Sequence, residues 1–377
     1  MRGRLSVLLV TAGLAVAACG GSPTSGVAEG PSSQATATSN PSTAATGPYA
    51  GYAGLTGQAR TDKLLADARA QGGVLDLYTS NTDIDDLVEA FTKAYPDIKV
   101  NAFRANGETV LQRILQEAKA DKTANDVVDT DSNELRALSE QGVLAPYDGP
   151  AKEHLRKEAI FDNWTAERFN AFVVGWNTTL VPSGQEPKSF TDLADPAWKG
   201  KVSMEVGDWD WYAAMHTYLT DVKHMPEAEV DDVFAKIAAN SKVAKGHTVQ
   251  GELLGAGQFA VAVSVYSHTV DKAAKKGAPV AWKPAVEPVI LRPNGLALMA
   301  KPRHPAAALL WTDWVLTEGQ KVIADSLRIP AETDVPGFDN PIPDGVTTYN
   351  MPDTVSQDSQ KWNKAYDDLL RNAPKAG

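Results

Sequence analysis

The stretch VLDLYTSNTDIDDLVEAFTKAYPDIKVNAFRANGETV, residues 74–110, alternates short apolar runs with amphipathic segments. The run at 74–78 predicts a strand, the apolar spacing around 87–91 predicts a helix, and 98–103 predicts a second strand. A second helix is expected from residue 107 to residue 120. Strand and helix alternate in this way in α/β folds with a mainly parallel sheet, which is the fold class that we predict.

The alternation continues with a strand at 126–129 and a helix that starts after Asp131, where Glu134 completes a capping-box pattern, and that ends at Gly142. In parallel sheets, ligands bind beyond the carboxyl ends of the strands. The three strand ends therefore predict one ligand-binding rim. Its residues are Thr79, Ser80, Asn81, Glu108, Thr109, Asp131 and Ser132.

The rest of the chain contains further apolar runs of strand length and apolar positions at helical spacing, without an internal repeat. The run at 258–266 is continuous, as expected of a strand buried on both faces. The other predicted elements are strands at 172–177 and 201–206, a strand pair at 288–299, and helices at 306–316 and 357–370.

The composition is that of a soluble globular protein, with 43% hydrophobic and 22% charged residues. A chain of 377 residues is long enough for two domains with substantial cores. The formal net charge of −11 and the lack of a basic stripe argue against a nucleic-acid partner, because phosphate binding depends on clustered Lys and Arg.

The single cysteine, Cys19, follows a segment typical of an export signal. Arg2 and Arg4 precede an apolar run from residue 5 to residue 18, which is too short to span a bilayer. The pattern resembles a bacterial lipobox, so we predict that Cys19 is acylated and becomes the mature N-terminus. An ordinary signal peptide with a cysteine near its cleavage site is the alternative. One cysteine excludes an intrachain disulfide.

The predicted leader is followed by a segment rich in Gly, Ser, Thr, Ala and Pro. Such a composition cannot bury enough surface to fold. We therefore predict a signal peptide at 1–18, a lipid-anchored tether at 19–60 and a globular body from about Thr61. No later hydrophobic stretch is long enough to span a membrane.

The stretch MEVGDWDWYAAM, residues 204–215, combines acids with large aromatic residues, as neither an ordinary loop nor a core does. The acids are Glu205, Asp208 and Asp210, and the aromatic residues are Trp209, Trp211 and Tyr212. The acids suit hydrogen bonds to a ligand or coordination of a hard cation, and the rings suit stacking on it. Two simpler interpretations stay open, with Asp208 as a helix N-cap and Trp211 in the core.

Three phrases of the sequence occur together in one known family. They are FVVGWNTTLVPSGQEPKSFTDLADPAWKGKV (172–202), GELLGAGQFAVAVSVYSHTVDKAAKKGAPVAW (251–282) and HPAAALLWTDWVLTEGQKVIADSLRIPAETDV (304–335). Over most of residues 62–335 the chain resembles the extracellular solute-binding proteins of ABC importers, in their ferric-iron-binding-like branch. The resemblance implies a two-lobed type II periplasmic-binding-protein fold. Each lobe is then a mainly parallel sheet flanked by helices, and the cleft between the lobes closes on the solute about a hinge.

The resemblance also implies where the lobes and the site lie. We expect crossing strands near 172–177 and 288–298, and the 204–215 stretch at the cleft opposite Thr79–Asn81. The expected parts are a first lobe at 61–172 with 292–330, a second lobe at 173–291 and a C-terminal extension at 331–377. The ligand-binding residues expected from the second lobe are Glu205, Asp208, Trp209, Trp211, Tyr212, Thr248 and Tyr266.

The solute is the most open question. Ferric iron requires hard oxygen ligands, and in the iron-binding members that the chain resembles two adjacent tyrosines supply phenolates. Here Tyr266 matches one tyrosine and Ser267 replaces the other, so Tyr266 is either a metal ligand or a hydrogen-bond donor to an organic ligand or the hinge. We rank iron(III) or an iron chelate first, an organic cation second, and a phosphorylated or phosphonate anion third.

The functional class that we predict is a binding protein and not an enzyme. The chain contains no G-x-S-x-G, H-E-x-x-H or Walker A motif. A secreted hydrolase that uses Glu205 with Asp208 is a remote alternative, and a surface sensor stays open. The expected partners are the solute and an ABC permease with its ATPase, for a monomer held at the outer face of the cytoplasmic membrane only by its lipid. No cofactor is expected, and iron would be cargo.

Overall fold

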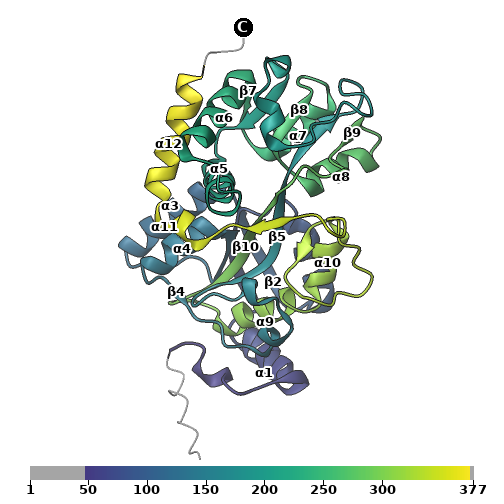
Figure 1. The fold of residues 1–377 in the computed structure, drawn as a ribbon. Coiled ribbons are helices and arrows are strands. Elements are labelled where there is room, and N and C mark those ends of the chain that lie inside the picture. The colour runs from purple at the N-terminus through teal and green to yellow at the C-terminus, as the bar shows by residue number, and fades with distance from the viewer. Residues whose placement is uncertain (1–46, 374–377) are drawn as a thin grey trace, which may run out of the picture. The chain divides into compact units, whose positions relative to one another are not determined.

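The computed structural model describes residues 47–373, and all of these lie in one compact unit that spans Ala44–Gly377. Twelve strands form one mixed sheet, in which the main path runs β2-β1-β3-β10-β5-β8-β6-β7 (Figure 1). The strands are β1 (Val74–Thr79), β2 (Lys99–Arg104), β3 (Val127–Asp131), β4 (Leu144–Ala145), β5 (Thr165–Asn177), β6 (Val202–Glu205), β7 (Ser241–Ala244), β8 (Val261–Tyr266), β9 (Val280–Ala281), β10 (Val289–Met299), β11 (Ile329–Pro330) and β12 (Thr348–Asn350).

Helices flank the sheet and follow the strands in the alternation that the sequence predicts, which confirms the α/β fold class. They are α1 (Gly57–Ala70), α2 (Ile84–Ala94), α3 (Gly107–Lys119), α4 (Ser132–Glu140), α5 (Trp209–Thr217), α6 (Glu227–Asn240), α7 (His247–Gly255), α8 (Ser267–Lys275), α9 (Pro305–Val315), α10 (Gly319–Asp325), α11 (Asp353–Gln357) and α12 (Ser359–Asn372). Within residues 47–373, short 3-10 helices and one π turn precede or lie between these elements.

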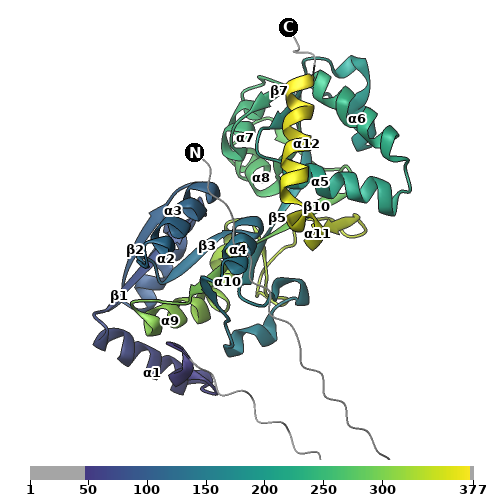
Figure 2. The ribbon, with the colours of Figure 1, turned by 90° about the vertical axis from the view of Figure 1, so that its left-hand side faces the viewer.

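One end of the sheet is parallel and belongs to the N-terminal part of the chain. There β1 pairs with β2 and with β3, and Leu77 lies opposite both Ala102 and Val127. The carboxyl ends of these strands meet, because parallel strands end at the same edge. The starts of α2, α3 and α4 are therefore brought to one edge (Figure 2).

The other end of the sheet repeats this arrangement with β6, β7 and β8. Here β6 pairs in parallel with both β7 and β8, and Val202 lies opposite Ser241 and Val261. Helix α5 follows β6, α7 follows β7 and α8 follows β8, so the N-termini of these three helices again lie at the carboxyl edge of the strands.

Two long antiparallel strands, β5 and β10, join the two parallel ends. Strand β10 pairs with β3 through Asn294–Leu298 and with β5 from Ile290 to Leu296. Strand β5 continues to pair with β8 from Phe172 to Trp176. Every side chain of both strands is buried. The polar residues on these two strands are therefore removed from solvent and must find their hydrogen-bond partners within the protein.

Apolar side chains form two clusters of buried residues. The larger contains Leu75, Leu77 and Phe91 and extends through Val173 to Val265. The smaller gathers Met204, Trp211 and Phe234 around β6, α5 and α6, and also includes Tyr366 of α12. Each parallel end of the sheet thus has helices packed on it, and the C-terminal helix belongs to the smaller cluster.

Three sequence-based boundaries need correction. The predicted strand pair at 288–299 is one continuous strand, Val289–Met299, even though Pro293 lies within it. Strand β5 starts at Thr165, seven residues before the predicted strand, because its first half carries buried polar side chains that do not read as an apolar run. The expected end of the tether at residue 60 falls inside α1.

The segment before α1 already contacts the body. The hydroxyl of Tyr49 donates to the carbonyl of Met299 at 2.8 Å, Tyr52 is buried, and Arg60 forms an ion pair with Asp313 at 2.6 Å. The predicted signal peptide and the lipidated Cys19 lie outside the described residues. No helix among residues 47–373 has the length and apolarity needed to cross a bilayer.

Candidate functional site

The polar centre of the molecule is the guanidinium of Arg292 on β10, which bonds groups from three other elements. Its Nη1 donates to Asp210 Oδ2 on α5 at 2.9 Å, and its Nη2 donates to Asp131 Oδ1 at the end of β3 at 3.1 Å. Nη2 also donates to the phenol oxygen of Tyr266, the last residue of β8. The two parallel ends of the sheet therefore meet at one side chain.

All of these groups are buried or nearly so, and their surroundings shift the pKa values of Arg292 and Tyr266. Burial alone would lower the pKa of Arg292, but the electrostatic effects of the Asp131 carboxylate, the Tyr266 phenol oxygen and the Asp210 carboxylate outweigh it and raise that pKa well above its ordinary value. Burial raises the pKa of the Tyr266 phenol well above its ordinary value, and the nearby charge of Arg292 only partly opposes this shift. Arg292 is thus a permanent cation, and Tyr266 is held as a neutral phenol.

The centre continues into a chain of hydrogen bonds through the joining strands. Asn294 donates to Asp131, and Asn170 of β5 donates to Asn294 at 2.9 Å. Arg328 donates to Asn170 at 3.0 Å and to Asp83 at 2.8 Å. Lys272 of α8 reaches the same oxygen of Asp83 at 2.8 Å. The network therefore extends from α5, through both joining strands, to α8 and the start of α2.

A second cluster lies beside Tyr266 and contains Glu205, Asp208 and His247, whose possible ligand atoms lie within 4.8 Å of one another. His247 Nε2 lies 3.0 Å from Asp208 Oδ1, and its ring packs on the Tyr266 ring with centroids 3.9 Å apart. Glu205 accepts backbone N–H groups from Gly207 and, at 2.6 Å, from Gly246. Its carboxylate thus joins the N-terminal turns of α5 and α7.

The surroundings of Asp208 and His247 shift the pKa of both groups upward. Burial raises the pKa of Asp208 to about 6, against the opposing effect of His247. Burial would lower the pKa of His247, but the carboxylate of Asp208 outweighs it and raises the pKa. Asp208 Oδ2 and His247 Nδ1 are buried without a hydrogen-bond partner, so the cluster has unused ligand atoms for a cation or water.

Another group of possible metal ligands, Asp76, Asp126 and His304, has a structural explanation. Asp126 Oδ1 accepts the backbone N–H groups of Arg303 and His304, and its Oδ2 accepts that of Asp76. These bonds fix the start of α9 against the sheet. We therefore assign this group to the fold and not to a metal site.

Three aspartates at helix N-cap positions bond side chains of other elements instead of capping their own helices. Asp83, Asp131 and Asp208 precede α2, α4 and α5, but none accepts a backbone N–H of its own helix. Each carboxylate bonds a cationic side chain instead: Asp83 bonds Lys272 and Arg328, Asp131 bonds Arg292, and Asp208 bonds His247. The predicted helix start at Asp131 is confirmed, but the capping-box hydrogen bonds expected there are not formed, and the interpretation of Asp208 as a simple cap fails in the same way.

A pocket of about 710 Å³ adjoins the centre and brings together two predicted residues, Glu108 of α3 and Trp209 of α5. Glu134 of α4 also lines it, and its Oε2 is buried without a partner. Burial, reinforced by the charge of Asp131, raises the pKa of Glu134 to about 8. Residues of α12, including Asn363 and Lys364, form the facing wall.

The other rim residues serve mainly the local backbone. Thr79 accepts the N–H of Asn81 at 2.9 Å, and Ser80 accepts the hydroxyl of Thr130 at 3.0 Å. Thr109 is exposed and its N–H is capped by Asn106, while Ser132 is buried at the start of α4. The rim residue that reaches the polar centre directly is Asp131.

Two of the aromatic candidates lie in the core. Trp211 is 1% exposed and packs edge-on against Phe190 and Phe234. Tyr212 packs on Tyr366 of α12 with ring centroids 5.4 Å apart. The structure thus favours the simpler interpretation of Trp211. Thr248 is exposed on α7 and is not among the residues that line the centre.

The structure brings together Asp131, Glu205, Asp208 and Tyr266, and it joins them to Arg292, which the sequence offers as a cation near the hinge, and to groups that no pattern singled out. His247 lies 39 residues beyond Asp208 and shows no ligand spacing in the sequence. Asn294 lies in a buried strand, where the only available signal was a polar residue within an apolar run. Asn133, which donates to Asp210 at 2.9 Å, carried no signal of its own.

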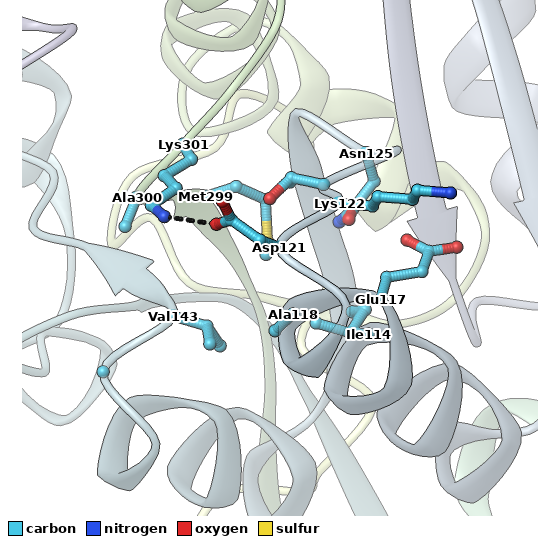
Figure 3. Close-up of a pocket in the computed structure, with 12 residues that line it drawn as sticks. Ile114, Glu117, Ala118, Asp121, Lys122, Asn125, Val143, Met299, Ala300 and Lys301 are labelled. Atoms are coloured by element: carbon cyan, nitrogen blue, oxygen red, sulfur yellow. Dashed lines mark hydrogen bonds and ion pairs between the residues drawn. The ribbon is translucent and has the colours of Figure 1, made fainter.

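A smaller cavity of about 190 Å³ lies away from this centre, between the C-terminal end of α3 and the C-terminal end of β10 (Figure 3). Its floor is apolar and includes Ile114, Val143 and Met299. An ion pair between Lys301 and Asp121, at 2.7 Å, lies beside it. Its lining contains none of the predicted site residues.

Comparison with known proteins identifies the class to which this fold belongs. The chain belongs to the family of bacterial extracellular solute-binding proteins, whose pattern matches residues 86–343. It is 30% identical over 149 residues to iron uptake protein A1 of a Synechocystis species, a match that covers 37% of this chain and 40% of that relative. The chain thus matches less than half the length of that protein.

Solved structures agree with this assignment at the level of the fold. A Trichodesmium protein in complex with iron and citrate aligns with a TM-score of 0.62 and 18% identity, over 79% of this chain and 99% of that one. A protein from Actinobacillus pleuropneumoniae with bound fructose-6-phosphate aligns with a TM-score of 0.67 and 19% identity, over 80% of this chain and all of that one.

These findings confirm the two-lobed type II periplasmic-binding-protein fold and the predicted class. The chain is a solute-binding protein of the bacterial extracellular family, which consists of binding proteins and not of enzymes. Iron-binding proteins are among its relatives. The first lobe contains β1–β3 and the second contains β6–β8, with β5 and β10 running between them.

Proposed function

We propose that this protein captures iron(III) together with a small anionic chelator, and that it delivers this solute to an ABC permease and its ATPase. The observation that carries the proposal is the convergence of Tyr266, Asp131 and Asp210 on the guanidinium of Arg292. Phenolate and carboxylate oxygens are hard ligands suited to ferric iron. A guanidinium is suited to the carboxylate of a chelator, which it binds through two parallel hydrogen bonds.

The balance of charge supports a solute that contains a cation. Four buried or half-buried acids, Asp131, Asp210, Glu205 and Asp208, lie near Arg292 and His247, with Glu134 close behind them. A metal ion supplies the missing positive charge at the acids, and the guanidinium of Arg292 binds the carboxylate of the chelator. The iron-binding relatives support the same solute class.

The mode of capture follows from the position of these groups. Asp131 lies at the end of a first-lobe strand, whereas Asp210 and Tyr266 belong to the second lobe. Closure of the lobes about β5 and β10 therefore assembles the site, and opening releases the solute to the permease. We further propose that acylated Cys19 and the segment up to residue 46 anchor the protein to the outer face of the cytoplasmic membrane, where it acts as a monomer.

An organic cation is the second candidate solute, because the pocket beside α12 offers what such a ligand needs. Trp209 presents an aromatic ring, and Glu108 and Glu134 present carboxyl groups. An aromatic face with acids around it is a recurring arrangement for quaternary ammonium groups. Titration with choline, followed by tryptophan fluorescence, tests this candidate, and saturable binding lost in Trp209→Ala would favour it.

Equilibrium dialysis against iron(III) citrate tests the leading candidate. We expect one iron per chain, and a loss of at least about tenfold in affinity for Asp131→Asn, because a charged oxygen ligand is removed. Glu140→Gln is the matched control, since this acid is exposed at the end of the same helix region. Equal binding by wild type, Asp131→Asn and the control would place the iron elsewhere or show that it is adventitious.

A further inference from the structure

The C-terminal segment 344–373 lies beyond the part of the chain that matches the family, yet it contacts the polar centre. Its strand β12 pairs in parallel with the start of β10, where Asn350 lies opposite Leu291. The N–H of Met351 donates to the carbonyl of Leu291 at 2.9 Å. The segment is thus fixed to the joining strand next to Arg292.

After β12 the chain enters α11, where Ser356 makes a contact with the first lobe. Its hydroxyl donates to Asn133 Oδ1 on α4 at 2.8 Å. The Nδ2 of the same amide donates to Asp210 Oδ2 at 2.9 Å, and that oxygen also accepts from Arg292. Because an ionised carboxylate only accepts, the amide nitrogen of Asn133 must face Asp210, and its oxygen is left for a donor. The hydroxyl of Ser356 is that donor.

Helix α12 then holds the second lobe at a different point. The hydroxyl of Tyr366 donates to the backbone carbonyl of Glu205 at 2.6 Å, and Tyr366 is 1% exposed. Its ring packs on Tyr212 of α5. Figure 2 shows α12 lying along the second lobe beside α5, with α11 at the level of β10. The segment therefore contacts the joining strand, α4 of the first lobe, and the turn between β6 and α5.

We propose that Ser356 and Tyr366 are positioning residues for the solute site and that segment 344–373 holds its two sides together. Ser356 orients the Asn133 amide, which holds the Asp210 carboxylate on α5 against Arg292. Tyr366 fixes the turn that carries Glu205 and Asp208. Neither residue touches the solute. The segment acts on how long the site stays assembled, and hence on the rate at which the solute leaves. This inference rests on the proposed function in placing the solute at Arg292.

The test compares single variants of the full-length protein loaded with iron(III) citrate. Transfer of iron to an excess of a competing chelator, followed by stopped-flow absorbance, gives the release rate. Loss of one neutral hydrogen bond corresponds to about a fivefold change, which we expect as faster release from Ser356→Ala. Ser356→Thr retains the hydroxyl and should restore the wild-type rate. Thr354→Ala removes an exposed hydroxyl from the same helix and should leave the rate unchanged.

A double-mutant cycle separates positioning from a general loss of stability. In an Asn133→Ala background the hydroxyl of Ser356 has no amide to orient, so Ser356→Ala should add nothing to the release rate. Additive effects of the two substitutions, or a wild-type rate for Ser356→Ala, would overturn the inference. Urea unfolding of each variant measures how much of any change is a loss of global stability.

A readout without solute keeps this inference distinguishable from the proposed function. If wild type binds no iron, the proposed function fails, and amide hydrogen exchange of α4 in the solute-free protein decides the inference alone. Ser356→Ala should then exchange faster than wild type across Ser132–Glu140, and Thr354→Ala should not. Equal exchange in all three proteins would refute the positioning role of Ser356.

Discussion

Arg292 Nη1 lies 2.9 Å from Asp210 Oδ2, and this buried ion pair connects the strand between the lobes to the first turn of α5. Asp210 is 1% exposed and Arg292 is 7% exposed. A pair so far from solvent costs desolvation energy that its mutual attraction must offset. The other terminal nitrogen of the guanidinium, Nη2, donates to Asp131 and to Tyr266, so Arg292 holds three polar groups of the site.

Replacement of Arg292 by Gln should destabilise the protein strongly. The substitution leaves the carboxylates of Asp131 and Asp210 buried near one another without their cation, a change that costs about 3–5 kcal/mol in comparable pairs. Urea unfolding followed by circular dichroism measures the free energy of unfolding. Arg303→Gln is the control, because Arg303 is largely exposed in its pair with Asp76 and should cost under about 1 kcal/mol. Similar losses for the two variants would contradict the assigned role of Arg292.

The stability of the solute-free protein should fall as the pH rises from about 5 to 8. The folded-state pKa of Glu134 is raised to about 8, mainly by burial, from an ordinary value of 4.5. Between these values the folded state binds more protons than the unfolded state, so the stability present below pH 4.5 is lost as the pH rises through 8. Asp208, with its pKa raised to about 6, acts in the same direction at lower pH.

The substitution Glu134→Gln isolates this effect. A neutral amide has no proton to lose, so much of the pH dependence between 6 and 8 should disappear. Each unit of pKa shift corresponds to about 1.4 kcal/mol, and we expect the variant to be more stable than wild type by over about 1 kcal/mol at pH 8. Glu140→Gln, an exposed change on the same helix, should retain the wild-type slope. An unchanged slope in Glu134→Gln would show that this carboxyl is ionised in the folded protein.

The two tryptophans of the 204–215 stretch should behave differently when they are substituted. Trp211→Ala removes a buried ring between Phe190 and Phe234 and should lower the free energy of unfolding by about 3–5 kcal/mol. Trp209→Phe, at a half-buried position beside the pocket, should leave stability within about 1 kcal/mol and reduce the change in intrinsic fluorescence on addition of iron(III) citrate. Retention of the full fluorescence change would remove Trp209 from the site.

The fold was largely predictable because periodicity is a local property of the sequence. The predicted strand at 74–78 and helix at 107–120 match β1 and α3 to within a residue. The first half of β5 was missed because buried Glu167, Arg168 and Asn170 interrupt the apolar pattern. Their burial depends on pairing with β10 and β11, which are far away in the sequence.

The site was only partly predictable, for the same reason. Glu205 and Asp208 were identified from their unusual local composition, and Tyr266 from the family resemblance. The convergence of Tyr266, Asp210 and Arg292 is a tertiary relationship between residues up to 82 positions apart. Local rules also assigned Asp131 and Asp208 to helix capping, but ion pairs formed by the whole fold direct both carboxylates elsewhere. At these positions the long-range charge partner is stronger than the local hydrogen bond.

The most direct test of the account is the metal content of the intact protein, purified without chelators and measured by elemental analysis with native mass spectrometry. We predict about one iron per chain, a small anion in the same complex, and a visible phenolate absorption band that is lost in Tyr266→Phe. A metal-free protein that carries a small organic molecule, with the same content in Tyr266→Phe, would contradict the proposed iron capture. Tyr266 would then be a hydrogen-bond partner of Arg292 and not a metal ligand.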